Sequence, residues 1–288
     1  MDTAEIKRGM LNRVKTEHFP GGKGLHVALA ANELGQQALL LGIWAGPTGE
    51  WLKEQCEALG VKCFGVEVPG WNRINYTLRS DSDWNETELV SHGPSIVAKH
   101  YETLLREFEK QLGAASAVVM SGSWPQGAPV DAYGAFIELA KQFGVPCWID
   151  CSGDLLNRAL THRPYGVHLN KNELQSSLPS SFEKEPEKYF LQFVKQVALT
   201  AGKDGLYLFS EEKTIHAVCI LEKIFSAVGS GDCLTAGLAV AHIRNYSMEE
   251  TARFAAACGS ANCLREDLGL LCRKDVEELL SKVKLNSV

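Results

Sequence analysis

The sequence has 288 residues, of which 45% are hydrophobic and 22% charged, ordinary values for a globular protein. A chain of this length buries about 75% of the surface that its unfolded form exposes. The net charge of −6 argues against nucleic acid or an anionic membrane as a partner. The sequence shows no apolar run of the ~20 residues that a membrane span needs, no signal-peptide core, and no paired spacing among its nine cysteines. We expect a cytoplasmic protein.

The first motif is a glycine-rich turn, Gly21-Gly22-Lys23-Gly24, followed by a run from Leu25 to Leu34. Apolar residues recur in this run at helical spacing. A strand is predicted next, over 39–43, and then a helix over 49–59. A protein of net negative charge that binds anions must concentrate positive charge locally, which draws attention to Lys23 and Arg73.

Between residues 61 and 90 the pattern changes to short alternating runs, typical of half-buried strands. A small β-sheet inserted here suggests a lid over a ligand site. Arg73 lies in this region, in the run Asn72-Arg73-Ile74-Asn75. A guanidinium group suits a phosphate well, although an arginine on a solvated strand is the alternative.

From Ser95 onward, predicted helices and strands alternate, which implies an α/β protein with a parallel sheet covered on both faces. The strands are expected at 117–120, 145–150, 197–200 and 206–209, and the helices at 129–144, 249–264 and 274–283. In the first of these helices, an inward stripe is formed by Phe136, Leu139, Ala140 and Phe143.

The stretch Ala227-Val228-Gly229-Ser230-Gly231-Asp232 reads as a tight turn that opens directly into a helix. The free N–H groups and the dipole at a helix start favour an anion. An acid in such a pocket makes sense if it removes a proton from a hydroxyl while the amides hold a phosphoryl group. The dinucleotide fingerprint needs a glycine where Leu234 stands, and a P-loop needs Lys after its last glycine. A plain helix-entry turn remains the alternative.

The pair GGKGLHVA and AVGSGDCLTAG resembles the two signatures of the PfkB carbohydrate kinase family, and in particular its 1-phosphofructokinase and tagatose-6-phosphate kinase branch. The resemblance implies one ribokinase-like domain over 1–288, with a central, mostly parallel sheet flanked by helices. Lid strands from about 5–19 and 61–92 would be inserted in it. The implied reaction uses ATP and Mg²⁺ to phosphorylate fructose 1-phosphate or tagatose 6-phosphate to the 1,6-bisphosphate. A homodimer through the lid is also implied.

By this resemblance Asp232 is the general base, and the amides of Gly229, Ser230 and Gly231 stabilise charge on the phosphoryl group. The other substrate-binding positions follow the family's pattern: Gly21, Gly22, Lys23, His26, Arg73 and Ser123. Lys23 and Arg73 would hold the phosphate that the substrate already carries. Relatives have asparagine where this chain has His26, so the substrate can differ from the family's usual one. A histidine packed at the helix start is the alternative.

The nucleotide is expected to contact Asn170, Thr200, Gly202 and Gly205, the last three through their backbone. Glu173 would hold hydrated magnesium, unless it only favours the helix dipole. Spacing alone fits an ordinary hairpin turn at 202–205 nearly as well. His168 and Leu169 depart from the family's pattern.

The N-terminus also departs from that pattern. In relatives, a hydrophobic strand ending in Asn-Pro-x-x-Asp precedes this region, and only Asp2 could stand for its aspartate. Either the true start lies upstream, or the protein lacks a central strand and a sugar ligand. Two other functions therefore stay open, a kinase for another sugar or a nucleoside and a non-catalytic sugar-phosphate-binding regulator.

Overall fold

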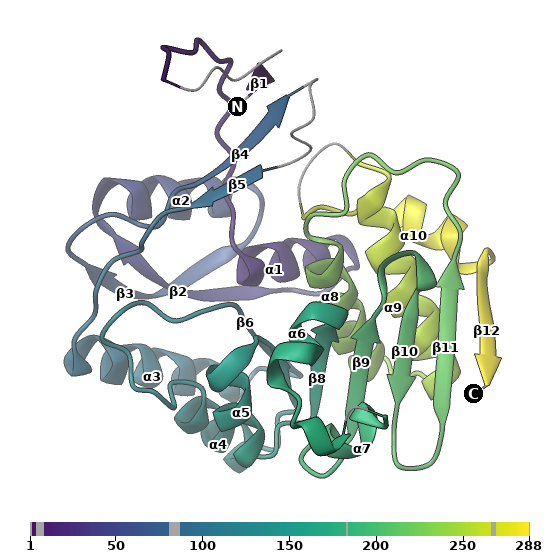
Figure 1. The fold of residues 1–288 in the computed structure, drawn as a ribbon. Coiled ribbons are helices and arrows are strands. Elements are labelled where there is room, and N and C mark those ends of the chain that lie inside the picture. Colours follow the sequence, from purple (N-terminus) through teal and green to yellow (C-terminus); the bar gives the residue numbers. More distant parts are fainter. Residues whose placement is uncertain (1, 4–8, 81–86, 183, 266–268, 288) are drawn as a thin grey trace.

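The computed structural model describes the whole chain except residues 1, 4–8, 81–86, 183, 266–268 and 288. Its main body is a seven-stranded sheet with the strand order β12-β11-β10-β9-β8-β7-β6 and helices on both faces (Figure 1). The pairings are parallel from β6 to β9 and antiparallel from β9 to β12. The predicted α/β class is confirmed. The strands are β6 (Val118–Ser121), β7 (Cys147–Asp150), β8 (Gly166–Asn170), β9 (Gln196–Thr200), β10 (Leu206–Phe209), β11 (Thr214–Cys219) and β12 (Val283–Ser287).

The two faces of this sheet contribute to two separate apolar cores, because successive side chains of a strand point to opposite faces. In β9, Val197 joins one core and Ala198 the other. Four helices cover the Ala198 face: α1 (Lys23–Glu33), α8 (Ser230–Ile243), α9 (Met248–Cys263) and α10 (Arg273–Leu280). The Val197 face packs against α3 (Ala98–Leu112), α4 (Gly134–Gln142), α5 (Gly153–Thr161) and α7 (Pro186–Phe190).

The stripe predicted for α4 is correct except at its end. Phe136 and Ala140 are buried and Leu139 is partly buried against the same core. Phe143, by contrast, is exposed. It lies just beyond the last turn of α4, as the C-cap residue, so helical spacing no longer sets its direction.

A second, two-stranded parallel sheet joins β2 (Leu39–Ala45) and β3 (Lys62–Val68), and α2 (Gly46–Ala58) connects them. Residues 62–68 were expected in the lid, and that prediction is wrong. Val66 and Val68 of β3 are buried in the core that contains α3. Their side chains bury more apolar surface by packing on the main body than they would on a lid strand. Among the described residues, β2 and β6 each have a strand neighbour on one side only.

The lid consists of β1 (Asp2–Thr3), β4 (Asn75–Ser80) and β5 (Thr87–Val90), in the order β1-β4-β5. It stands above the body, beside the N-terminus (Figure 1). Of the segment 5–19, residues 5–8 lie outside the described residues, and 9–19 form no strand longer than a single bridge residue. Residues 81–86 of the other lid segment are likewise not described. Among the described residues, no helix is both long and apolar enough to span a bilayer.

Candidate active site

The two glycine motifs meet where the first turns of α1 and α8 approach each other, and these helices lie side by side (Figure 1). Gly229, the N-cap of α8, has φ 83°, a left-handed conformation that favours glycine. A Cβ at Gly229 would lie 2.2 Å from Cα of Gly269, and one at Gly231 would lie 3.0 Å from Cε1 of His168. Gly229 is therefore required by close packing as well as by the turn, whereas a Cβ at Gly231 would press on the ring of His168.

Two of the three predicted amides are free to receive an anion. Among the described residues, the N–H groups of Gly229 and Gly231 have no backbone acceptor, whereas that of Ser230 donates to the carbonyl of Ala227 at 3.1 Å. The turn closes at Ser230, which is why its amide is already used. The start of α8 thus offers unpaired donors together with the positive end of the helix dipole.

Asp232 lies in the first turn of α8 and is only 5% exposed. Its Oδ2 accepts a hydrogen bond of 2.9 Å from Nδ1 of His26, in the first turn of α1. Burial, and secondarily the negative charge of Asp150, raise the pKa of Asp232, and the bond from His26 only partly offsets them. A buried carboxylate with a raised pKa beside free amides is suited to accept a proton.

Asp150 is the functional-site residue that sequence reasoning missed. It ends β7 and is fully buried, where Oδ1 accepts a 2.6 Å hydrogen bond from Nζ of Lys23 and Oδ2 accepts bonds from His168 and Thr235. Burial alone would raise the pKa of Asp150, but His168 and Lys23 more than offset it and lower that pKa. Its one sequence signal is a single acid at the end of an apolar strand.

Lys23 has different contacts from those expected of a phosphate ligand. Besides Asp150, its Nζ lies 3.6 Å from Oε1 of Glu173. Burial would lower the pKa of Lys23, yet the charge and hydrogen bond of Asp150 raise it. Its charge is therefore already compensated by two carboxylates, which leaves less of it for a substrate phosphate. Gly21 and Gly22, which precede it, are both exposed.

His168 connects the nucleotide side of the site to this network. Its Nδ1 lies 3.1 Å from Oδ2 of Asp150, and its Nε2 lies 3.2 Å from Oγ1 of Thr200. The hydroxyl of Thr200 also lies 3.3 Å from the carbonyl oxygen of Leu169. The hydroxyl of Thr200 is thus engaged by β8, so only its backbone remains for the nucleotide contact that was expected there.

Asn170 and Glu173 form a capping box at the start of α6 (Lys171–Ser177). The side chain of Asn170 accepts from the amides of Asn172 and Glu173, and Oε2 of Glu173 accepts from the amide of Asn170. The alternative weighed for Glu173, a helix-start role, is therefore realised in the structure. The described residues contain no group of three or more metal-ligating side chains, so Glu173 fits magnesium only as an outer ligand through water.

Gly202 and Gly205 lie in the loop between β9 and β10, which form an antiparallel hairpin. Gly205 has φ 87°, and a Cβ there would lie 2.3 Å from the carbonyl oxygen of Ala217. Packing against β11 is thus sufficient reason for that glycine. Gly202 has φ 58° and open space around it, so its backbone is accessible.

Arg73 and Ser123 come together from the base of the lid and from the loop after β6. Nη1 of Arg73 donates a long hydrogen bond of 3.4 Å to Oγ of Ser123. The preceding residue, Asn72, is held firmly, because its Oδ1 accepts from the amide of Ala45 at 2.6 Å. Arg73 therefore has an anchored backbone and an exposed guanidinium group, for which Ser123 is a weak partner and the only one among the described residues.

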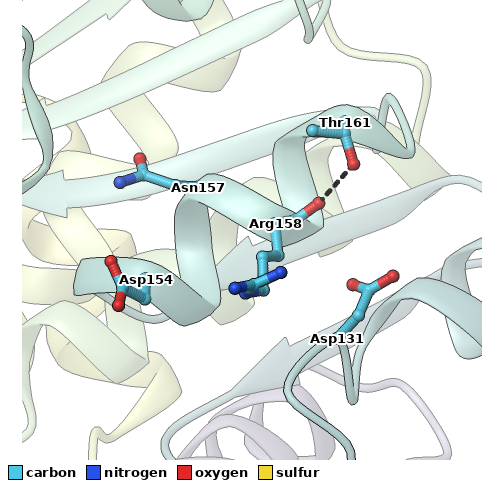
Figure 2. A pocket seen from close by; sticks show the side chains of 5 residues that line it. All are labelled: Asp131, Asp154, Asn157, Arg158 and Thr161. Atoms are coloured by element: carbon cyan, nitrogen blue, oxygen red, sulfur yellow. Dashed lines mark hydrogen bonds between the residues drawn. The ribbon is translucent and has the colours of Figure 1, made fainter.

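A separate hollow of about 340 Å³ lies beside α5, lined by Asp131, Asp154, Asn157, Arg158 and Thr161 (Figure 2). None of the predicted site residues lines it. The one hydrogen bond drawn in it joins the hydroxyl of Thr161 to the carbonyl oxygen of Arg158.

Comparison with known proteins agrees with this geometry. The model of the pfkB family carbohydrate kinases matches residues 2–274. The chain belongs to this family. It is therefore a carbohydrate kinase, an enzyme that takes its phosphoryl group from ATP, and the resemblance and ribokinase-like fold inferred from the two glycine motifs are confirmed.

Individual relatives cover nearly the whole chain. The chain is 30% identical to the 1-phosphofructokinase of Bacillus subtilis, over 96% of this chain and 92% of that protein. It is 26% identical to a tagatose-6-phosphate kinase of Staphylococcus epidermidis, with the same coverage. Among solved structures, phosphofructokinase-2 from Escherichia coli in complex with potassium superposes with a TM-score of 0.88 and 26% identity, covering 97% of this chain and 93% of that one.

Proposed function

We propose that this pfkB-family kinase transfers the γ-phosphoryl group of ATP to a primary hydroxyl of a ketohexose phosphate, giving a 1,6-bisphosphate. The acceptor is fructose 1-phosphate or tagatose 6-phosphate. The observation that carries the proposal is Asp232, a buried acid held at 2.9 Å by His26 beside the free amides of Gly229 and Gly231. The names of the relatives, 1-phosphofructokinase and tagatose-6-phosphate kinase, support the substrate class.

In the proposed mechanism, Asp232 takes the proton of the acceptor hydroxyl as its oxygen attacks the γ-phosphorus. General-base catalysis of this kind contributes about 10²–10⁴-fold in rate. The free amides at the start of α8 stabilise negative charge on the transferring group. When bound, Mg²⁺ neutralises the nucleotide phosphates, and Glu173 would hold it through water. The backbones of Gly202 and Thr200 and the exposed residue Asn170 offer contacts for the nucleotide.

On the acceptor side, Arg73 is proposed to bind the phosphate that the sugar already carries. Within the described part of the chain, its exposed guanidinium group has one weak partner, Ser123, so little interaction energy is lost when a phosphate takes the place of that hydroxyl. Gly21 and Gly22 would approach the sugar through their backbone. Lys23 would contribute less than Arg73, since Asp150 and Glu173 already share its charge.

The decisive experiment measures ADP release from purified protein with Mg-ATP and a panel of acceptors. The panel contains fructose 1-phosphate, tagatose 6-phosphate, fructose 6-phosphate, free fructose and a nucleoside. Turnover with one of the first two supports the proposal. Turnover only with free fructose or the nucleoside would replace it with the other kinase function. Silence with every acceptor, from protein that binds ATP, would favour the non-catalytic regulator that His26 and the altered His168 leave open.

Arg73→Ala separates phosphorylated from free acceptors. We expect KM for the phosphorylated acceptor to rise about 10- to 100-fold, since a hydrogen bond to a charged group is worth about 1.5–3 kcal/mol. Arg106→Ala is the control, because Arg106 is an exposed arginine of α3 that bonds only its neighbour Thr103 among the described residues. An unchanged KM in Arg73→Ala would refute the phosphate-binding role.

We also propose that the whole chain works as one domain in the cytoplasm and dimerises through the lid. Four large apolar side chains are exposed on the lid strands and at their base: Ile74, Tyr76, Leu89 and Val90. Single exposed apolar residues need no explanation, whereas a group of them marks an interaction surface. Light scattering of wild type and Leu89→Glu tests the dimer, which the substitution should dissociate. The nine cysteines are free, as is usual in a reducing compartment.

A further inference from the structure

Two contacts hold the side chain of His26 in place. Nδ1 donates to Oδ2 of Asp232 at 2.9 Å, and the ring packs on Gly269, whose missing Cβ would lie 2.2 Å from Cγ of the ring. Gly269 is itself packed on Gly229, because a Cβ added to Gly229 would lie 2.2 Å from Cα of Gly269. The imidazole is thus fixed against the same glycine turn that carries the free amides of α8.

The two oxygens of Asp232 have different surroundings. His26 occupies Oδ2, and within the described part of the chain Oδ1 has no hydrogen-bond partner. A carboxylate only accepts hydrogen bonds, so the shared proton sits on Nδ1 of His26. The ring's orientation therefore determines which oxygen of Asp232 remains available.

The charges that face Asp232 come from two elements. His26 and Lys23 reach it from α1, and Asp150 acts on it from β7. Lys23 is bonded to Asp150 at 2.6 Å, so its charge is mostly compensated there. Asp150 disfavours a second negative charge nearby. The bond from His26 is consequently the main local interaction that favours an ionised Asp232.

We propose that His26 is a positioning residue for the base: its Nδ1–H holds Oδ2 of Asp232, leaves Oδ1 for the acceptor's proton, and keeps the buried carboxylate ionised until the hydroxyl arrives. In the step that follows, the O–H bond breaks and its proton passes to Oδ1. The oxygen's electron pair forms the bond to the γ-phosphorus, and the bond from phosphorus to ADP breaks. The inference rests on the proposed kinase function.

The first test is the pH dependence of kcat/KM, which reports the essential base of the free enzyme. In His26→Leu, the acid limb should move to higher pH by about one to two units, the scale of a hydrogen bond to a charged group. His26→Asn, which retains an N–H donor, should restore most of that shift. His162→Leu is the matched control, because His162 also bonds a carboxylate, Asp131 at 2.7 Å, but lies outside the site. An acid limb that is unmoved in His26→Leu overturns the inference.

A second test needs no turnover. In protein with ¹³C-labelled aspartate carboxyls, the Asp232 signal is identified by its loss in Asp232→Asn, and its titration midpoint should rise in His26→Leu. In wild type with ¹⁵N-labelled histidine, the ring of His26 should carry its proton on Nδ1. A wild-type ring with the proton on Nε2 alone would overturn the inference even if His26→Leu does not fold. If both signals behave as expected but no acceptor is phosphorylated, the pairing stands and the proposed function fails.

Discussion

The end of β7 and the start of α8 each place one aspartate in the interior, and the two carboxylates have opposite surroundings. Asp150, at the end of β7, has Lys23, His168 and Thr235 as partners, and its pKa is lowered despite burial. Asp232, in α8, has His26 alone among the described residues, and its pKa is raised. Environments that push two pKa values apart separate an anchoring carboxylate from a reactive one.

The largest expected effect distinguishes the reactive carboxylate. Asp232→Asn should lower kcat about 10²–10⁴-fold, while ATP and acceptor still bind. Its thermal stability should not fall, because the substitution removes a buried charge that the fold does not fully compensate. Steady-state kinetics and a melting curve measure the two quantities, with Asp204→Asn at the exposed Lys171 pair as the control. Undiminished turnover would remove Asp232 from the role of base.

The anchoring carboxylate should respond in the opposite way. Asp150→Asn removes the negative charge and one of the two acceptor oxygens that Lys23 and His168 use, and breaking a buried ion pair typically costs about 3–5 kcal/mol. Because the side chain of Lys23 is 39% exposed, we expect the lower end, about 3 kcal/mol of unfolding free energy. Urea unfolding at pH 7 measures it. A loss no greater than that of Asp204→Asn would show that Asp150 is no anchor.

The pH dependence of stability should carry opposite signs at the two positions. The lowered pKa of Asp150 gives stability that is present above the unfolded value of about 3.9 and is lost as pH falls through the folded pKa. The raised pKa of Asp232 gives stability that is present below about 3.9 and is lost as pH rises through the folded pKa. At pH 7, Asp232→Asn should therefore have a larger unfolding free energy than wild type. Urea unfolding should show this difference disappearing as the pH is lowered to 3. An advantage independent of pH would contradict the assignment.

The smallest effect concerns a single hydrogen bond of Asp150, the one from the hydroxyl of Thr235. Thr235→Val keeps the shape but removes the hydroxyl that lies 3.2 Å from Oδ2 of Asp150 and 2.9 Å from the carbonyl oxygen of Gly231. We expect a loss of about 1 kcal/mol in unfolding free energy, since His168 still bonds the same oxygen. Thr103→Val, whose hydroxyl bonds a helix carbonyl on the surface of α3, is the control. Equal losses in both variants would show that the bond to Asp150 adds nothing.

The sequence was a good guide where local pattern decides structure. The strand predicted at 206–209 is β10, and the helix predicted at 249–264 is α9, displaced by one residue. Both glycine turns begin helices, because glycine permits the turn and the helix-like pattern follows directly. The resemblance, rather than spacing, assigned Arg73 and Ser123 to the same ligand, and the structure brings their side chains within 3.4 Å of each other.

Long-range packing accounts for what the sequence did not reveal. The alternating pattern of 62–68 does not say which sheet the strand joins, and burial of Val66 and Val68 in the body decided it. A lone acid that ends an apolar strand gives no hint that Lys23, His168 and Thr235, from three other elements, all converge on it. The resemblance that assigned Lys23 to the substrate phosphate could not show that Asp150 and Glu173 compensate its charge.

By itself, the sequence determined the α/β class and the position of Asp232 at the start of a helix, because glycine, helix-start and strand signals act over a few neighbouring residues. The kinase activity was indicated by the resemblance to the PfkB family. Only the tertiary structure decided how the two buried aspartates differ. The pKa of a carboxyl depends on burial and on the charges and hydrogen-bond donors within a few ångströms, and His26, the hydrogen-bond partner of Asp232, lies 206 positions away in the chain.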